Sequence, residues 1–221
     1  MRVDPYRPAT KNRRVPAFSL IELLTVIAII AVLLVAAMPM FSNSAVNASQ
    51  ASREIVKAHL QQARAHAIAS GSSTAVAIPV LGSGGELGAR AISLFEVEKA
   101  GGTYTPAKDA NGDELLLQRW ETLPGNFHFL TASQVSSGKP TIVDSADTLQ
   151  TNYKGKALTC HLIVFAPNGQ IVLPASEINI ALAQAAPRGN SLAPTRKNGG
   201  SPVFDLIQVN RLTGRTRSIQ P

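Results

Sequence analysis

Residues 17–38 read AFSLIELLTVIAIIAVLLVAAM, and this stretch decides the fold of the N-terminal part of the chain. Phe18 opens about twenty almost wholly apolar residues, which is the length of one membrane-spanning helix. Glu22 is the one charged side chain in this run. An ionised carboxylate near the centre of a bilayer costs roughly 2.5 kcal/mol or more, and less toward an end of the span. A charge kept there needs a partner, so Glu22 is a candidate functional residue.

The segment from Ala17 to Pro39 resembles the N-terminus of type IV prepilins, in which a small residue precedes the cleavage point and Phe-Thr/Ser-Leu-Ile-Glu opens an apolar helix. The resemblance implies that a prepilin peptidase/methyltransferase cuts between Ala17 and Phe18 and N-methylates the new amino terminus. It implies that Glu22 pairs with the Phe18 ammonium of a neighbouring subunit, because two charges that are costly alone in lipid offset each other. Pro39 stands where pilins often carry a helix-kinking proline. The family usually has Gly before the cut, whereas this chain has Ala17 after Pro16.

Two other interpretations of the apolar run stay open at this point. An uncleaved membrane anchor explains the run but not the carboxylate of Glu22. A secretory signal peptide explains Arg13, Arg14 and a long apolar run, and Val46-Asn47-Ala48 then serves as the cleavage site that releases a soluble chain. The run exceeds the usual ~7–15 residues of such peptides and contains a charge, so the prepilin-like interpretation is favoured.

The formal net charge of +7 is unevenly divided along the chain. Residues 1–17 hold five basic and one acidic side chains, a net of +4, which leaves 16 of the 21 basic and 13 of the 14 acidic ones, a net of +3, for the rest. The basic leader is therefore an orientation signal, because positive residues stay in the cytoplasm while the remainder crosses the membrane. The mature domain is near neutral, so no general affinity for polyanions follows.

Cys160 is the single cysteine, so no intrachain disulfide can form. It stands in the apolar run 160–165, where a buried and inert thiol is expected. Major pilins commonly close a C-terminal loop with a disulfide, so the lone cysteine favours a minor subunit.

Four regions are expected: a cytoplasmic basic leader over 1–17, a transmembrane helix over 18–39, an amphipathic continuation of that helix over 40–71, and a β-rich extracytoplasmic domain over 72–221. Apolar residues recur near the 3.6-residue period up to Ser70, and polar ones such as Lys57 and Arg64 occupy the other side. Gly71 is a natural helix stop. The apolar stripe needs a sheet to cover it, so the predicted class is α+β: a long N-terminal helix packed against a C-terminal antiparallel β-sheet domain, as the pilin resemblance implies.

Short β-rich runs separated by Gly, Pro and Asn follow this helix. Candidate strands are 74–80, 91–98, 114–121, 127–130, 162–166, 170–173, 204–209 and 215–219. Asn168-Gly169 is a good hairpin turn because this pair accepts positive φ, and 212–214 turns the final pair. The stretches 82–88, 101–112, 133–147 and 183–201 are expected to be surface loops. Trp120 is expected to pack on the helix from its strand.

The C-terminal quarter resembles H-type minor pseudopilins of type II secretion and FimT-type minor pilins. Both end in two hairpins, the first with a Phe-x-x-x-Gly turn and the second with a closing Gly-Arg, which 165–169 and 214–215 match. In FimT-type pilins a Gly-Arg-x-Arg tail is linked to DNA capture, and 214–217 matches it. Arg215 and Arg217 would point the same way from one strand, since side chains alternate, and with Arg211 they suit phosphate oxygens. The alternative is that these arginines bind no DNA and belong to a turn followed by a solvated edge strand.

No enzyme signature is found in the sequence. Gly82-Ser83-Gly84-Gly85 lacks the Lys-Ser/Thr of a phosphate loop, and no Gly-x-Ser-x-Gly elbow occurs. His59 and His66 are about two helical turns apart, ~10 Å along the axis, which is too far for one metal ion. Both are expected to be solvated, and neither a metal nor a cofactor is expected.

The sequence therefore predicts a non-enzymatic prepilin-like subunit, a minor pilin or pseudopilin of a type IV pilus or a type II secretion pseudopilus. Its partners would be the prepilin peptidase/methyltransferase, other pilin or pseudopilin subunits and the inner membrane, which it crosses once with its leader in the cytoplasm. The alternative is a FimT-like minor pilin that captures DNA through its C-terminal arginines.

Overall fold

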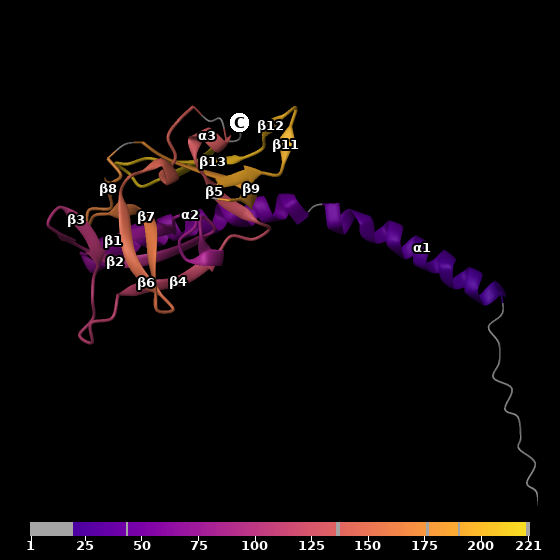
Figure 1. The fold of residues 1–221 in the computed structure, drawn as a ribbon, viewed down its shortest axis with the longest axis horizontal. Helices are drawn as coiled ribbons and strands as arrows, with labels where there is room; N and C mark the ends of the chain where they lie inside the picture. The colour runs from indigo at the N-terminus through magenta and orange to yellow at the C-terminus, as the bar shows by residue number, and fades with distance from the viewer. Residues whose placement is uncertain (1–19, 43, 136–137, 176, 190, 220–221) are drawn as a thin grey trace, which may run out of the picture. The chain divides into compact units, whose positions relative to one another are not determined.

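The computed structural model describes residues 20–219 except 43, 136–137, 176 and 190. The chain divides into two units, residues 1–43 and residues 44–221. Helix α1 (Leu20–Ser42) belongs to the first, whereas helix α2 (Ser44–Ser70) and the strands belong to the second (Figure 1). The predicted class is confirmed: an N-terminal helix is followed by an antiparallel β-sheet domain. The predicted leader, 1–17, lies outside the described residues.

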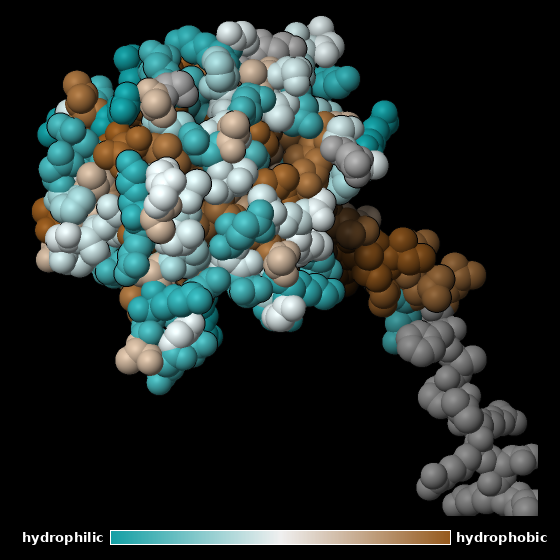
Figure 2. Space-filling model, turned by 60° about the vertical axis from the view of Figure 1, so that its left-hand side comes forward, coloured by the Kyte–Doolittle hydropathy of each residue, from teal (hydrophilic) through white to brown (hydrophobic). Residues whose placement is uncertain are grey.

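Helix α1 exposes apolar side chains over residues 20–34. Leu20, Leu24, Ile29 and Leu33 are each more than half exposed, and Figure 2 shows this helix largely in brown. Judged by length and hydropathy, none of the helices in the described part of the chain qualifies as a membrane span. Pro39 lies inside α1, three residues before its end.

Helix α2 forms because its apolar residues recur on one face. Val56, Leu60, Ala63 and Ala67 are fully buried, and their spacing matches one stripe of a 3.6-residue helix. Gly71 ends the helix as expected: its φ is +70°, and its N–H donates to the Ala67 carbonyl over 3.1 Å.

The strands build two main sheets. The first contains β1 (Ser73–Pro79), β2 (Ala91–Ala100), β3 (Thr103–Pro106), β4 (Leu116–Thr122), β6 (Thr148–Tyr153), β7 (Lys156–Phe165) and β8 (Ile171–Leu173), and its main order is β3-β2-β1-β7-β6. The second contains β5 (Phe127–Leu130), β9 (Ile178–Arg188), β10 (Ser191–Pro194), β13 (Asp205–Val209) and β14 (Thr216–Ile219), in the order β10-β9-β13-β14 with β5 on the other edge of β9. Smaller elements are β11 (Lys197–Asn198), β12 (Ser201–Pro202), α3 (Ala132–Val135), and the short helices Gly85–Leu87 and Ile142–Asp144.

Both sheets pack on α2, which lies between them (Figure 1). The buried stripe of α2 meets Val76 and Ile163 from the first sheet and Ile180 and Ile207 from the second, in one hydrophobic core. Polar contacts also join α2 to the second sheet. Asp205, at the start of β13, accepts a hydrogen bond from Ser49 Oγ over 2.5 Å and lies 3.5 Å from the Arg53 guanidinium. The sequence predicted that one sheet covers the apolar stripe of the helix, whereas two sheets cover it in the structure.

Each sheet also buries its outer face. In β1, Val76 and Ile78 face α2 while Ala75 and Ala77 join a second cluster, so the strand is buried on both faces. The edge strands β3 and β6 contact each other over this second cluster. Trp120 packs there, and the prediction that it packs on the helix is wrong, because its strand presents it to the face away from α2.

Eight predicted strands occur, with ends shifted by a few residues except at β5, but several strands were not predicted. The expected surface loop 183–201 contains most of β9 and all of β10 and β11, and the expected loop 101–112 contains β3. These two predictions are wrong. In β9 large side chains (Ile178, Ile180, Leu182) face α2, and alanines face a third cluster under α3. Its alternation is of size rather than polarity, so the usual pattern is missing.

Candidate functional site

The N-terminal candidate site begins outside the described residues, because Ala17 and Phe18 precede Leu20. Glu22 lies in the first turn of α1, where the partial positive charge of the helix N-terminus favours a carboxylate. The carbonyl of Glu22 accepts a hydrogen bond from Thr25 Oγ1 over 2.8 Å. The pairing of Glu22 with a Phe18 ammonium remains a prediction.

The C-terminal candidate site is built from two hairpin turns. In the β7–β8 turn, the Gly169 N–H donates to the Ala166 carbonyl over 2.8 Å, and Gly169 adopts φ +77°. In the β13–β14 turn, the Gly214 N–H donates to the Asn210 carbonyl over 2.7 Å, and Gly214 adopts φ +62°. The Asn210 side chain caps this turn, because its Oδ1 accepts hydrogen bonds from the Leu212 and Thr213 N–H groups. Both predicted hairpins are confirmed.

Helix α2 presses on both turns, and this explains their glycines. The Arg64 Nε–H donates to the Gly169 carbonyl over 3.3 Å. A Cβ at Gly169 would lie 2.8 Å from Ile68, and a Cβ at Gly214 would lie 2.7 Å from Arg64 Cδ and 3.1 Å from the ring of Phe165. The two hairpins also meet each other, because the Ile171 N–H at the start of β8 donates to a carbonyl in the second turn over 2.9 Å.

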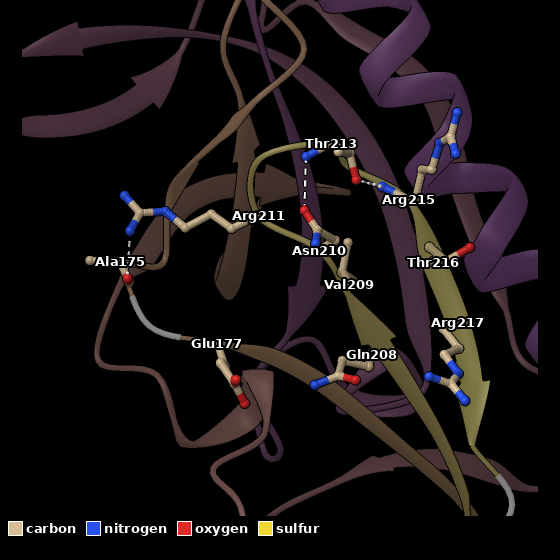
Figure 3. Close-up of a pocket in the computed structure, with 10 residues that line it drawn as sticks. All are labelled: Ala175, Glu177, Gln208, Val209, Asn210, Arg211, Thr213, Arg215, Thr216 and Arg217. Carbon is tan, nitrogen blue, oxygen red and sulfur yellow. Dashed lines mark hydrogen bonds between the residues drawn. The ribbon is translucent and has the colours of Figure 1, made fainter.

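Three arginines surround an open pocket of about 710 Å³ beside the second turn (Figure 3). Arg211 is held in place, since its Nε–H and Nη1–H donate to the Ile171 and Ala175 carbonyls over 3.1 and 2.8 Å. Arg215 extends beside α2, and Arg217 lies farther along β14, where it pairs in register with Gln208. Both are exposed, and within the described residues neither guanidinium has a hydrogen bond or an ion pair. Glu177 is the acidic side chain of the lining.

Sequence reasoning missed Arg64 as a member of this basic surface. The helical pattern places Arg64 on the solvated side of α2, but it borders a hollow that also includes Gln61, Ile68 and Arg215. With Arg211, Arg215 and Arg217 it makes four arginines at one end of the domain. No local signal joins a helix residue to a turn some 150 positions later; only the packing of α2 on the turn does so.

The histidines were expected to be solvated, and for His59 this is wrong. Its side chain is buried, its Nδ1–H donates to the Ile55 carbonyl over 2.9 Å, and its Nε2 lies 3.7 Å from a Glu121 carboxylate oxygen. His66 is half-buried and lies 3.1 Å from Thr74 Oγ1. Among the described residues, no three His, Cys, Asp or Glu side chains are placed to hold a metal ion.

Cys160 is fully buried, as expected. Burial raises the pKa of its thiol far above the ordinary value, and the nearby Glu114 carboxylate adds to the shift. The thiolate is therefore scarce at neutral pH and the group is inert.

Comparison with known families identifies the N-terminal segment. Residues 12–38 match the prokaryotic N-terminal methylation motif. The chain carries a type IV prepilin-like methylation motif.

Among solved structures, the prepilin-like chain is similar to the crystal structure of the type IV minor pilin FimU of Pseudomonas aeruginosa strain PAO1. The TM-score is 0.42 at 16% sequence identity, over 79% of this chain and 90% of that one. A comparison with curated protein sequences finds no match.

Proposed function

We propose that this protein is a minor structural subunit of a filament, either a type IV pilus or a type II secretion pseudopilus. A prepilin peptidase cuts between Ala17 and Phe18, and α1 then packs with the corresponding helices of other subunits. Before assembly the segment 18–39 anchors the chain in the inner membrane, with the leader in the cytoplasm and the β-rich domain outside. The methylation motif on residues 12–38 carries this proposal, and the position of Glu22 in the first turn of α1 supports it.

The apolar surface of α1 supplies the driving force for packing. The large apolar side chains of residues 20–34 are exposed in the described chain, and they gain van der Waals contacts with other helices when α1 moves from lipid into the filament core. That gain is not directional, so it does not set the register between neighbouring helices. A single pair, Glu22 with the Phe18 ammonium of the next subunit, sets the register, because an unpaired charge in an apolar filament core is strongly unfavourable.

Processing is tested by the intact mass and N-terminal sequence of the protein recovered from host membranes. We expect a chain that begins at N-methylated Phe18. A chain beginning at Met1 would mean that Pro16-Ala17 blocks cleavage, and a soluble chain beginning at Ser49 would establish the signal-peptide interpretation instead.

Assembly is tested by Glu22→Gln, which keeps the shape of the side chain and removes its charge. We expect normal membrane insertion and loss of the variant from sheared filaments. Glu54→Gln is the matched control, since Glu54 is exposed on α2 and pairs with Lys57 over 3.1 Å; exposed pairs of this kind contribute little. Wild-type levels of Glu22→Gln in the filament fraction would refute the register mechanism.

A second candidate function is DNA capture by the same subunit. The exposed guanidiniums of Arg215 and Arg217, which have no partner among the described residues, favour it. Exposed arginines beside an open pocket are suited to phosphate oxygens. The test is the salt dependence of DNA binding by the purified chain. Arg215→Glu with Arg217→Glu should weaken binding and lower the slope of log K against log salt by about one for each phosphate that the protein no longer neutralises.

Arg188→Glu with Arg196→Glu is the control for this test, because both residues are exposed and the change in net charge is identical. Equal loss of DNA binding in the two double variants would indicate a general charge effect. Absence of DNA binding at low ionic strength would exclude the second candidate while leaving filament assembly untouched.

A further inference from the structure

A second open pocket, of about 640 Å³, lies on the first sheet beside β4 and the end of β6. Trp120 and Tyr153 line it, with ring centroids 6.5 Å apart and ring planes at 82°, so the two rings form the walls of a corner. The buried Phe95 ring supports Trp120 from the core, with a centroid distance of 5.8 Å. The corner is therefore an aromatic surface fixed from behind and open in front, on the face of the sheet away from α2.

The strand that carries Trp120 is locally irregular. The pairing of β2 with β4 shifts its register twice, between Ile92 and Leu94 and between Leu94 and Phe95. Gln118 is paired with Leu94 and Glu121 with Ile92, so Trp120 falls within the irregular segment. Bulges are over-represented beside functional sites, and this irregular segment lies beside the pocket that Trp120 lines.

The rest of the pocket offers both donors and acceptors of hydrogen bonds. Its polar lining comprises Lys108, Asp113, Glu114, Arg119, Asn152 and Lys154. The Glu114 carboxylate is held across the pocket, since it accepts from Thr151 Oγ1 and from the Asn152 N–H. Three cations face two carboxylates, so the lining as a whole favours neither an anion nor a cation.

We propose that this pocket binds a neutral saccharide, with one pyranose ring stacked on the indole of Trp120. A pyranose presents an apolar face of C–H bonds and a rim of hydroxyls, each of which both donates and accepts. The apolar C–H face of the sugar can stack in the corner of Trp120 and Tyr153, and its hydroxyls can bond to the mixed donors and acceptors of the polar lining. Ligand pockets of roughly 300–1,000 Å³ with a few convergent polar groups bind small molecules. An organic cation fits less well, because Lys154 already lies over the Tyr153 ring, 5.2 Å from its centroid.

The test uses the full chain in a detergent without a sugar headgroup. Trp120 is the single tryptophan, so selectively excited tryptophan emission reports on this pocket. Neutral oligosaccharides of glucose, galactose, mannose and N-acetylglucosamine are titrated, and hits are confirmed by calorimetry. We expect at least one saccharide to change the emission saturably.

Variants then connect binding to the pocket. Trp120→Ala, measured by calorimetry, should weaken binding by about tenfold or more, and Trp120→Phe should retain part of it. Asn152→Ala, at an exposed rim position, tests the same site without touching the core. Lys156→Ala is the control for Asn152→Ala, because Lys156 is exposed on the same hairpin but does not line the pocket.

Three outcomes would overturn the proposal. They are absence of a saturable response to every saccharide of the panel, undiminished binding by Trp120→Ala and Asn152→Ala, and saturable quenching of Trp120 by a second copy of the chain with no response to sugars. The last outcome would make the pocket a protein contact.

Discussion

Replacing Gly214 by alanine tests how closely α2 packs on the C-terminal turn. Two effects add. The residue has φ +62°, and a left-handed conformation costs a non-glycine residue about 1–2 kcal/mol. The new Cβ would also lie 2.7 Å from Arg64 Cδ and 3.1 Å from the Phe165 ring, and overpacking of this kind costs about 1–3 kcal/mol. We expect Gly214→Ala to lower the free energy of unfolding by about 2–5 kcal/mol.

Gly101→Ala separates the two effects. Gly101 has φ +59°, close to the value at Gly214, but a Cβ there meets nothing within 4 Å. It should therefore show the conformational cost of about 1–2 kcal/mol alone. Each further kcal/mol lowers Tm by about 2–4 °C in a domain of this size. Urea and thermal unfolding followed by circular dichroism would give both quantities.

A double-mutant cycle with Arg64→Ala identifies the atom responsible. Removal of the Arg64 side chain removes the closest contact of the new Cβ at position 214, whereas the contact with Phe165 stays. Gly214→Ala should therefore cost less in this background. The reasoning fails if Gly214→Ala costs no more than Gly101→Ala, or if the cost is the same with and without Arg64.

Two further predictions concern buried polar groups in the same domain. Asp205→Ala should lower the free energy of unfolding by about 1.5–3 kcal/mol, because Ser49 and Arg53 lose a charged hydrogen-bonding partner; urea unfolding measures this, and a change below about 0.5 kcal/mol would contradict it. Burial lowers the pKa of His128 and His161 below the ordinary value of 6.5, so the unfolded chain takes up these protons first and stability should fall as the pH drops below about 6.5. Unfolding at pH 7.5 and 5.5 checks the slope, which His128→Gln with His161→Gln should flatten.

Several parts of this fold follow from local sequence. The buried stripe of α2, its end at Gly71 and the strand 127–130 were predicted because each depends on spacing or on one residue's backbone preference. The two C-terminal hairpins follow from their glycines in the same way. The sequence therefore predicts that Arg211, Arg215 and Arg217 lie together at the second hairpin.

Other parts depend on what lies across the core. Strand β9 sits between β5 and β13 and is buried on both faces, so its INIALAQAAPR sequence alternates large with small residues and resembles a loop in polarity. His59 is polar and lies on a helix, and its burial depends on the strands that pack against α2, among them β4, whose Glu121 carboxylate lies 3.7 Å from Nε2. Arg64 joins the basic surface through packing alone.

The bond between Ser49 and Asp205 joins positions 156 residues apart. A polypeptide is made from its N-terminus, so the start of α2 exists long before its polar partner does. Strands β1 and β2 can pack on the helix early, because they follow it directly in the chain. The remaining side of α2 stays uncovered until the second sheet has emerged. Completion of this domain thus depends on nearly its last residues, and a chain halted before β13 would present an apolar helix face to whatever surrounds it.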